Sequence, residues 1–330
     1  MHLQHYFELS LTLDNEKFNK LLNRIYDKSN GELYSGDDKY VDKSLASKGI
    51  TVAYYDNSKK KIKLTVDMNW ILGDDETDHD NIAKSVRKLE SRLDDYFCTK
   101  HSIDDFKVSK MGIIADIDVH KRWNVAAYLK ILQKIGRVKG FSSLNDSRLD
   151  SNSSFCLKGN SNGIEFMTYD LEKLARDQLI ETNSKPKKLK SIAEKAEGIL
   201  RVEVWLKAQK TIRDFTEEIF VSEQIVDLSK NSEKIFLDIF MRIIPFGDYY
   251  KKNKAAEIIT KEVKDRVLRR KMLRLLVLVP EKKSLLLAQK ALGCRRTEDV
   301  MEMFSSIEVS PVTISKRHDF KKLENIYKYL

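Results

Sequence analysis

Alternating hydrophobic and polar residues predict several strands in the first part of the chain. Residues 3–13 place a row of leucine and phenylalanine side chains on one face, as a half-buried strand does. Two further apolar runs, 50–55 and 62–69, flank the polar turn Asp-Asn-Ser-Lys-Lys, which predicts a hairpin. A longer run at 106–120 is apolar enough for a central strand.

A second hairpin and one more strand are predicted in the middle of the chain. Apolar runs on either side of Gly-Asn-Ser-Asn-Gly predict a hairpin over 155–170. Residues 199–207 alternate as a half-buried strand does. The apolar side chains of that strand point one way, and Arg201, Glu203 and Trp205 point the other way.

Hydrophobic residues recur at helical spacing between these strands and throughout the last third of the chain. Asp14 is expected to cap a helix that runs to Tyr26 and is ended by the Asn-Gly pair at 30–31. Ser310 followed by Pro311 predicts the start of another helix. The further helices are predicted at 81–97, 122–135, 235–244, 255–278, 284–292, 297–304 and 311–317. Loops are predicted at 28–47, 74–80 and 140–154.

Together these elements predict an α+β fold, in which a mainly antiparallel sheet of about five strands carries helices on one face. The Pro-Phe-Gly-Asp turn at 245–248 interrupts the helical pattern and is the predicted domain boundary. The chain would thus divide into an α+β domain, residues 1–245, and a smaller α-helical domain, residues 246–330. A length of 330 residues agrees with about two domains of ~150 residues each.

Composition favours a soluble protein of a reducing compartment. Cys98, Cys156 and Cys294 are odd in number and far apart, which predicts free thiols and no zinc site. The N-terminus lacks the charged start and apolar run of a signal peptide. No apolar run approaches the ~18 residues that cross a bilayer. We therefore expect a cytoplasmic protein without membrane contact.

The positive charge is concentrated at the C-terminal end. Residues 251–330 contain 20 Lys and Arg against 10 Asp and Glu, whereas residues 1–250 contain 40 of each, so the last quarter holds the whole net charge of +10. A neutral body with a basic end is typical of a nuclease-like domain joined to a DNA-anchoring module. A solvated basic surface without a specific partner explains the asymmetry equally well.

Acidic side chains gather at the end of the predicted 106–120 strand. Asp116, Asp118 and His120 share one face, because side chains alternate along a strand. Such an oxygen-rich cluster suits Mg²⁺ or Mn²⁺. A strand end that meets solvent is the alternative, and the residues alone favour it. The acidic run at 74–80 lacks the glycine and final glutamate of a calcium loop, so we interpret it as a solvated loop and helix start.

Tyr169 stands at the junction between the second hairpin and a helix-forming segment, and Lys173 follows it by one helical turn. Glu203 belongs to the next predicted strand. A tyrosine at such a junction, facing a glutamate, can support phosphodiester chemistry. Most tyrosines at strand ends pack or cap, so the residues alone favour a structural role for Tyr169.

Two motifs in this region, Tyr-Asp-x-Glu-Lys at 169–173 and Leu-Arg-Val-Glu-Val at 200–204, resemble those of rolling-circle replication initiators. The chain most resembles the gene II/X family of filamentous-phage and plasmid replication proteins. The resemblance continues through Leu-Arg-Arg-Lys-Met-Leu-Arg at 268–274, Pro-Glu-Lys-Lys-Ser-Leu at 280–285 and Ser-Pro-Val-Thr-Ile-Ser at 310–315. It therefore extends over nearly the whole chain.

The resemblance implies an endonuclease that nicks one DNA strand at an origin and starts rolling-circle replication. Tyr169 would be the nucleophile, which keeps the 5′-phosphate and frees a 3′-hydroxyl. A tyrosine of pKa ~10 is a poor nucleophile unaided. A Mg²⁺ or Mn²⁺ ion on Asp116 and Glu203 would polarise the phosphate. Lys173 would assist the phenol or the leaving oxygen, and Arg201 would contact phosphate or brace the glutamate.

The sequence departs from the family pattern at several positions. Lys110 and Gly112 replace the arginine and the first aspartate of the family's acidic strand motif, whereas Asp116 keeps the second aspartate. Asp116 is therefore the first choice of metal ligand, with Asp118 and His120 as supporting candidates. No His-hydrophobe-His motif is present, which predicts a carboxylate site.

Two further features bear on the implied mechanism and fold. Leu171 stands where family members often carry a lysine, and no second tyrosine lies one turn from Tyr169, which predicts a single-tyrosine mechanism. The resemblance also implies the rolling-circle nuclease fold, with the metal ligands, tyrosine and glutamate converging on one region of the sheet.

The expected partners are double-stranded origin DNA, single-stranded DNA and the host replication helicase and polymerase. Short helices near the C-terminus predict a helix-turn-helix that presents Thr313, Ser315, Lys316 and Arg317 to DNA. The lysine-rich run at 185–190 would contact phosphates or lie in a solvated loop. Two alternatives are a non-catalytic DNA-binding replication regulator and a conjugative relaxase with the same chemistry at a transfer origin.

Overall fold

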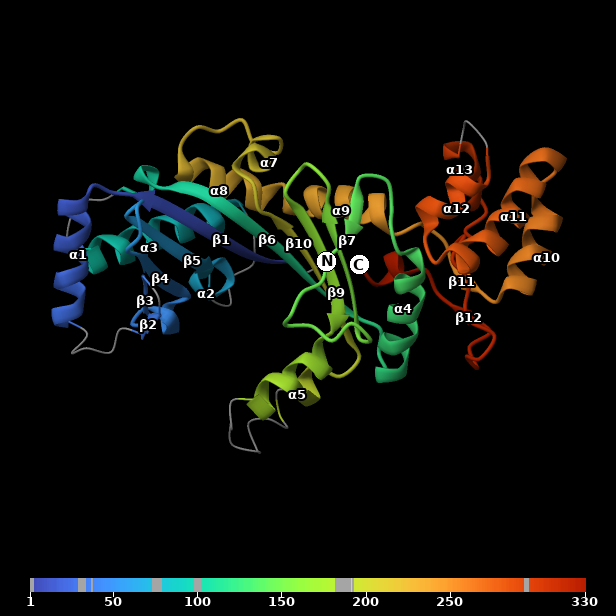
Figure 1. Cartoon of the computed structure of the whole chain (residues 1–330), viewed down its shortest axis with the longest axis horizontal. Helices are drawn as coiled ribbons and strands as arrows, with labels where there is room; N and C mark the ends of the chain where they lie inside the picture. The colour runs from blue at the N-terminus through green and yellow to red at the C-terminus, as the bar shows by residue number, and fades with distance from the viewer. Residues whose placement is uncertain are drawn as a thin grey trace.

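The computed structural model describes residues 3–28, 34–36, 38–72, 79–97, 102–181, 191, 193–293 and 297–330. The strands of the large sheet are β1 (Leu3–Thr12), β2 (Tyr34–Gly36), β3 (Lys39–Asp42), β4 (Ile50–Tyr55), β5 (Lys61–Asp67), β6 (Lys107–Asp118), β7 (Phe141–Ser143), β8 (Ser154–Gly159), β9 (Ile164–Asp170) and β10 (Ile199–Leu206). Within the described ranges these ten strands pair in the order β2-β3-β4-β5-β1-β6-β10-β9-β8-β7. Every neighbouring pair is antiparallel, and β1 and β6 lie at the centre (Figure 1).

The mixed α/β composition and the antiparallel sheet agree with the prediction, but the expected number of strands is wrong. Instead of about five strands, the described sheet has ten. Residues 28–47 and 140–154, predicted to be loops, contain β2, β3 and β7. These strands are three or four residues long and lack an apolar alternation, so periodicity cannot reveal them.

The helices begin and end largely where local signals place them. Asp14 accepts a hydrogen bond of 2.8 Å from a first-turn amide of the first helix, and Gly136, with a φ of +57°, ends the fourth. The Asn-Gly pair at 30–31, most of the acidic run at 74–80 and the lysine-rich run at 185–190 lie outside the described residues. The described α-helices are α1 (Asn15–Lys28), α2 (Met68–Leu72), α3 (His79–Phe97), α4 (Arg122–Ile135), α5 (Leu171–Glu181), α7 (Gln209–Arg213), α8 (Val221–Lys230), α9 (Ser232–Ile243), α10 (Lys252–Glu262), α11 (Arg266–Lys282), α12 (Leu285–Ala291) and α13 (Glu298–Ser306).

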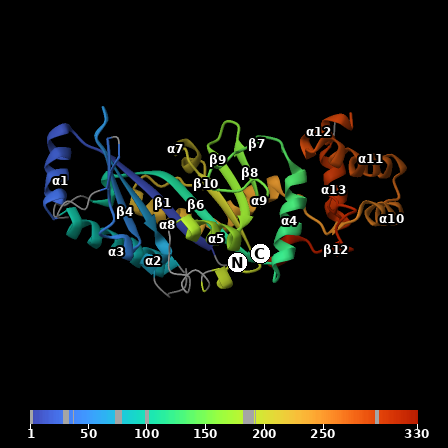
Figure 2. The same ribbon diagram turned by 60° about the horizontal axis from the view of Figure 1, so that its bottom comes forward.

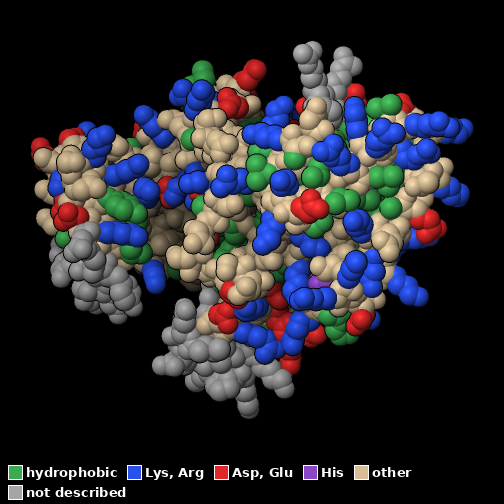
Figure 3. Space-filling view, turned by 45° about the vertical axis from the view of Figure 1, so that its right-hand side comes forward, with side chains coloured by type: hydrophobic (Ala, Val, Ile, Leu, Met, Phe, Trp, Pro, Cys, Tyr) green, Lys and Arg blue, Asp and Glu red, His purple; other side chains and the backbone are tan. Residues whose placement is uncertain are grey.

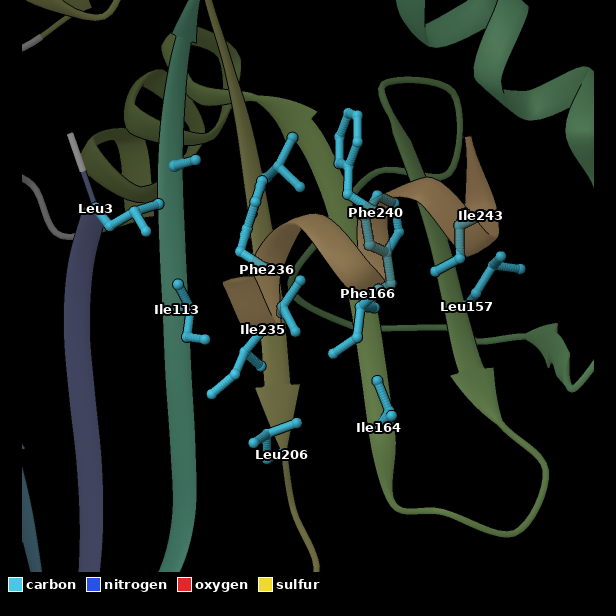
Figure 4. Close-up of a cluster of buried hydrophobic side chains, with 14 of the residues drawn as sticks. Leu3, Ile113, Leu157, Ile164, Phe166, Leu206, Ile235, Phe236, Phe240 and Ile243 are labelled. Carbon is cyan, nitrogen blue, oxygen red and sulfur yellow. The ribbon is translucent and has the colours of Figure 1, made fainter. Parts of the chain in front are cut away.

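Helices cover the face of the sheet on which alternate strand residues are buried. In β1, every second side chain is buried. α1 covers the outer strands, where Phe18 packs on Tyr54 of β4 with 6.1 Å between ring centroids. α9 lies over β9, where Phe240 packs on Phe166 with 6.2 Å between ring centroids (Figure 4). This apolar layer fixes the sheet on which the candidate site lies.

The opposite face of the sheet carries polar and aromatic side chains. Tyr6, Gly112 and Trp205 lie opposite one another on β1, β6 and β10. Arg201 and Glu203 point to the same side as Trp205, while the apolar residues between them are buried, as the alternation of β10 predicts. We call this surface the open face.

The described chain after Ile244 adds four α-helices, a short 3-10 helix (Ile326–Tyr329) and the strands β11 (Tyr249–Tyr250) and β12 (Lys322–Leu323). Its Lys and Arg side chains are spread over the surface in Figure 3. The single basic helix predicted over 255–278 is wrong, because Asp265 caps a new helix, α11, by accepting hydrogen bonds from two of its first amides. Val267, in the first turn of α11, is 65% exposed.

The helix predicted at 311–317 is absent, and with it the predicted helix-turn-helix. Two β-bridges, of Val309 with Asp248 and of Ile314 with Lys251, fix this segment, and no residue from 309 to 317 is helical. Ser310 is buried and starts no helix, and Thr313 is only 5% exposed, so its side chain is not presented to DNA. A serine-proline pair favours a helix start locally, but here burial of the bridged segment is the stronger effect.

The C-terminal segment contacts the sheet-covering layer through α4. Tyr128 of α4 donates a hydrogen bond of 2.9 Å to the carbonyl of Glu324, and Lys134 donates one of 2.6 Å to the carbonyl of Thr313. A boundary at residue 245 stays a prediction. Among the helices that the structure describes, none is both long and apolar enough to cross a membrane.

Candidate functional site

Strand pairing places Tyr169 and Glu203 next to each other on the open face. Tyr169 of β9 lies opposite Arg201 of β10, and Glu203 follows two residues later on the same face. The Tyr169 hydroxyl donates a hydrogen bond to Oε1 of Glu203, and Nε1 of Trp205 donates one of 2.7 Å to Oε2. The carboxylate of Glu203 therefore has a donor on each oxygen.

Tyr169 is held as a neutral phenol. Its side chain is 5% exposed. Burial and the negative charge of Glu203 raise the pKa of Tyr169, and the positive charge of Arg201 offsets part of that rise. Because Glu203 already accepts the phenolic hydrogen bond, it is the group placed to take the proton when the oxygen attacks an electrophile.

Asp116 and Arg201 form a bidentate ion pair beside the tyrosine. They lie opposite each other on β6 and β10, with Nε–Oδ1 and Nη2–Oδ2 distances of 2.6 and 2.7 Å. Their side chains are 30% and 20% exposed, so they are more accessible than Tyr169. Burial disfavours the charge on Arg201, but Asp116 overcomes that effect and raises the pKa of the guanidinium, which stays charged.

The other predicted site residues, Lys173, Asp118 and His120, make their contacts outside the group formed by Tyr169, Glu203, Arg201 and Asp116. Lys173 forms an ion pair with Asp150 rather than with the phenol, and its amide donates a 3.0 Å hydrogen bond to Asp170. Asp118 accepts a 2.7 Å hydrogen bond from the amide of His120. β6 ends at Asp118, and the positive φ of +69° at His120 breaks the strand alternation. Asp116 and Asp118 therefore share a face of the strand, as predicted, but His120 does not. The sequence could not reveal this turn.

Arg148 belongs to the site and has no signal in the sequence, since it lies in the polar segment after β7. Its Nη2 atom is 3.8 Å from Sδ of Met167 and 2.6 Å from Oδ2 of Asp146. The hydrogen bonds from Arg148 lower the pKa of Asp146. Met167 lies opposite Glu203 on the neighbouring strand, so its contact with Arg148 brings a second guanidinium to the site.

Gly112 allows the Trp205 ring to lie across β6. A Cβ atom at Gly112 would be 2.8 Å from two ring carbons. The ring reaches Tyr6 on the next strand, with 6.4 Å between centroids and 38° between planes. Position 112 is the one at which the resembling family carries an aspartate. Here that side chain would collide with the indole, so the tryptophan and the glycine are a matched pair.

We expect Gly112→Ala to displace Trp205 and to destabilise the fold by about 1–3 kcal/mol, because overpacking forces neighbouring side chains to shift. Urea unfolding measures the cost, and acrylamide quenching of tryptophan fluorescence measures the exposure of the displaced ring. The control is the same change in a Trp205→Phe background, where the smaller ring leaves room for the methyl group. An equal cost in both backgrounds would show that the indole is not the cause.

Asp116 and Glu203, the two carboxylates predicted to hold a metal ion, lie on neighbouring strands and offer the hard oxygens that Mg²⁺ and Mn²⁺ prefer. In the part of the chain that the structure describes, no group of three or more His, Cys, Asp or Glu side chains is placed to hold an ion. Each oxygen of Asp116 bonds to Arg201 but retains a second lone pair. The donors fit an ion bound by one or two carboxylates and completed by water or phosphate oxygens.

No family model matches the sequence, and no curated protein matches it either. Membership of the rolling-circle initiator family thus stays a prediction. The structure itself places Tyr169, Glu203, Arg201 and Asp116 on three adjacent strands, β9, β10 and β6.

Proposed function

We propose that the protein nicks one DNA strand at a replication origin, with Tyr169 as the nucleophile, and so starts rolling-circle replication. The observation that carries this proposal is the hydrogen bond from the Tyr169 phenol to Glu203, with Arg201 and Arg148 close by. A nucleophile, a proton acceptor and fixed positive charges are the groups that displacement at a phosphodiester needs.

In the proposed reaction, the Tyr169 oxygen attacks phosphorus while its proton passes to Glu203. The new bond joins the phenolic oxygen to phosphorus, and the bond from phosphorus to the 3′-oxygen breaks. The released 3′-oxygen takes a proton from solvent, which leaves a 3′-hydroxyl and a 5′-phosphotyrosyl link. Arg201 and Arg148 stabilise the charge on the phosphate oxygens. A Mg²⁺ or Mn²⁺ ion on Asp116 and the glutamate would supply Lewis-acid polarisation of the phosphate.

The burial of Tyr169 constrains how DNA reaches it. The phenol is almost covered, whereas the Asp116 and Arg201 side chains keep 30% and 20% of their surface exposed. A phosphate would therefore enter beside Arg201, and the side chains over the phenol would have to move apart.

The basic C-terminal segment would hold double-stranded origin DNA. Its helices α10 and α11, with the turn between them, expose Lys261, Lys264, Arg266 and Arg270. Counterion release from phosphates makes such contacts favourable for any DNA sequence. Residues 246–330 would then anchor the duplex, while the freed 3′-hydroxyl would serve the host polymerase and helicase.

The test is incubation of the full chain with Mg²⁺ or Mn²⁺ and a supercoiled plasmid that carries the DNA surrounding its own gene. We expect open circles and a covalent 5′-phosphotyrosyl adduct that peptide mapping places at Tyr169. An adduct at another residue would overturn the assignment. Binding without nicking would favour the regulator, an alternative that the near burial of the phenol supports, and nicking confined to a transfer origin would indicate the relaxase.

A further inference from the structure

The ten-stranded sheet is built from two halves with the same topology. The first half runs β1, α1, β2 to β5 and pairs in the order β1-β5-β4-β3-β2. The second runs β6, α4, β7 to β10 and pairs in the order β6-β10-β9-β8-β7. α1 and α4 each have 14 residues and lie toward opposite ends of the sheet (Figures 1 and 2). An approximate twofold axis therefore passes between β1 and β6, which pair antiparallel.

Equivalent positions in the two halves carry different chemistry. In the second half, Asp116 lies two residues before the end of β6. Arg201 of β10 pairs with it, and Tyr169 of β9 pairs with Arg201 in turn. In the first half, the equivalent position of β1 is Ser10. Lys63 of β5 pairs with it, and Ala53 of β4 pairs with Lys63 in turn. The first half thus has a cation, Lys63, at the position of Arg201, but Ala53 stands at the position of Tyr169 and Ser10 at that of Asp116. These three residues cannot perform the same chemistry.

Lysines surround Lys63 on the open face of the first half. Glu8 forms ion pairs with Lys63 at 3.1 Å and with Lys110 at 2.9 Å. Tyr55 presents its ring to two lysines, with 5.2 Å from its centroid to Nζ of Lys63 and 5.6 Å to Nζ of Lys39. Burial and the neighbouring lysines lower the pKa of Lys61. We call this group the lysine strip: Lys39, Lys61, Lys63, Lys107 and Lys110 with Tyr55.

An aromatic pair connects the lysine strip to the candidate active site. Tyr6 and Trp205 lie between the two halves, where β1, β6 and β10 run side by side. Trp205 donates to Glu203, which in turn accepts from Tyr169. Strand spacing and rise put Tyr55 roughly 40 Å from Tyr169 along this diagonal of the sheet.

We propose that the lysine strip and the Tyr6–Trp205 pair form a binding track for single-stranded DNA that leads to Tyr169. Lysines that follow a backbone, with aromatic rings between them on which bases stack, are how proteins hold single strands without reading sequence. The length of the track agrees with the ~4–16 nucleotides that single-strand-binding folds cover. The track gives the first half a function of its own, which does not depend on the nicking reaction.

A purely solvating role for these lysines is the competing explanation, since charged side chains on strands keep sheets from aggregating. Two features favour DNA. The lysine strip places five lysines on β3, β5 and β6 around the Tyr55 ring, and Glu8 forms ion pairs with two of them, Lys63 and Lys110. The same face continues to a site with two further guanidinium groups, Arg148 and Arg201.

Fluorescence anisotropy with a labelled oligothymidylate of about 12 nucleotides tests the track in the full-length protein. We expect Tyr55→Ala to weaken binding about 10-fold, because stacking contributes strongly per base, and Tyr55→Phe to bind like the wild type. Joint replacement of Lys39, Lys63 and Lys107 by alanine should reduce the slope of log Kd against log salt by about 2, at ~0.7 per lost phosphate contact.

The control replaces Lys17, Lys20 and Lys84 by alanine, which removes the same charge from exposed positions of α1 and α3. This variant should bind as the wild type does. Equal weakening in both triple variants, or equal loss of binding to a duplex of the same length, would overturn the track, because either would show a general effect of charge. Tyr169→Phe should keep full affinity for the oligothymidylate, so failure of nicking and failure of the track are separate results.

Discussion

Tyr169→Phe should abolish nicking and the covalent adduct while the protein still folds and binds DNA. The change removes one oxygen, and Glu203 keeps its hydrogen bond from Trp205. Loss of a nucleophile typically lowers turnover by about 10⁴-fold or more. The measurement is the rate at which supercoiled plasmid becomes open circles, together with the amount of DNA that stays attached to protein after denaturation.

Tyr54→Phe is the matched control, because it also removes a buried phenolic oxygen. The Tyr54 hydroxyl lies 3.0 Å from that of Tyr96, on the other face of the sheet. This variant should nick at the wild-type rate and lose only about 1 kcal/mol of stability. Wild-type nicking by Tyr169→Phe would mean that another residue is the nucleophile.

The directions of the site side chains could be predicted because they follow from local periodicity. Alternation along 199–207 places Arg201, Glu203 and Trp205 on one face, and the structure agrees. The partner of Arg201 could not be predicted in this way. Its carboxylate, Asp116, lies 85 residues away in the chain, and only the pairing of β10 with β6 brings them together. Register between distant strands is a property of the whole sheet.

The number of strands in the sheet and its repeated topology could not be predicted from the sequence either. Strands of three or four residues, such as Tyr34–Gly36, carry too few residues to show a period. The break at Asp265 depends on a single capping side chain inside a long basic run. The non-helical conformation of 309–314 depends on bridges to the distant residues Asp248 and Lys251, so the local helix signals at Ser310 and Pro311 do not determine it.

Phe240→Ala should destabilise the protein by about 3–5 kcal/mol, which is a large share of the stability of a typical domain. The Phe240 side chain is fully buried under the sheet. Its ring stacks on Phe236 with 5.6 Å between centroids and contacts Phe166 at 6.2 Å (Figure 4). The Tyr327 ring lies 4.9 Å from it. Alanine would leave a cavity among these rings. The midpoint of urea unfolding, followed by circular dichroism, measures the loss.

Met241→Ala provides the control on the same helix, since Met241 is 61% exposed, and its effect should stay within about 0.5 kcal/mol. A wild-type midpoint for Phe240→Ala would contradict the packing described for α9. The cavity is expected to weaken the packing of two segments that are distant in the chain. Phe166 belongs to the strand that carries Tyr169, and Tyr327 ties the C-terminus to α9, so one cavity would loosen the site strand and the basic segment together.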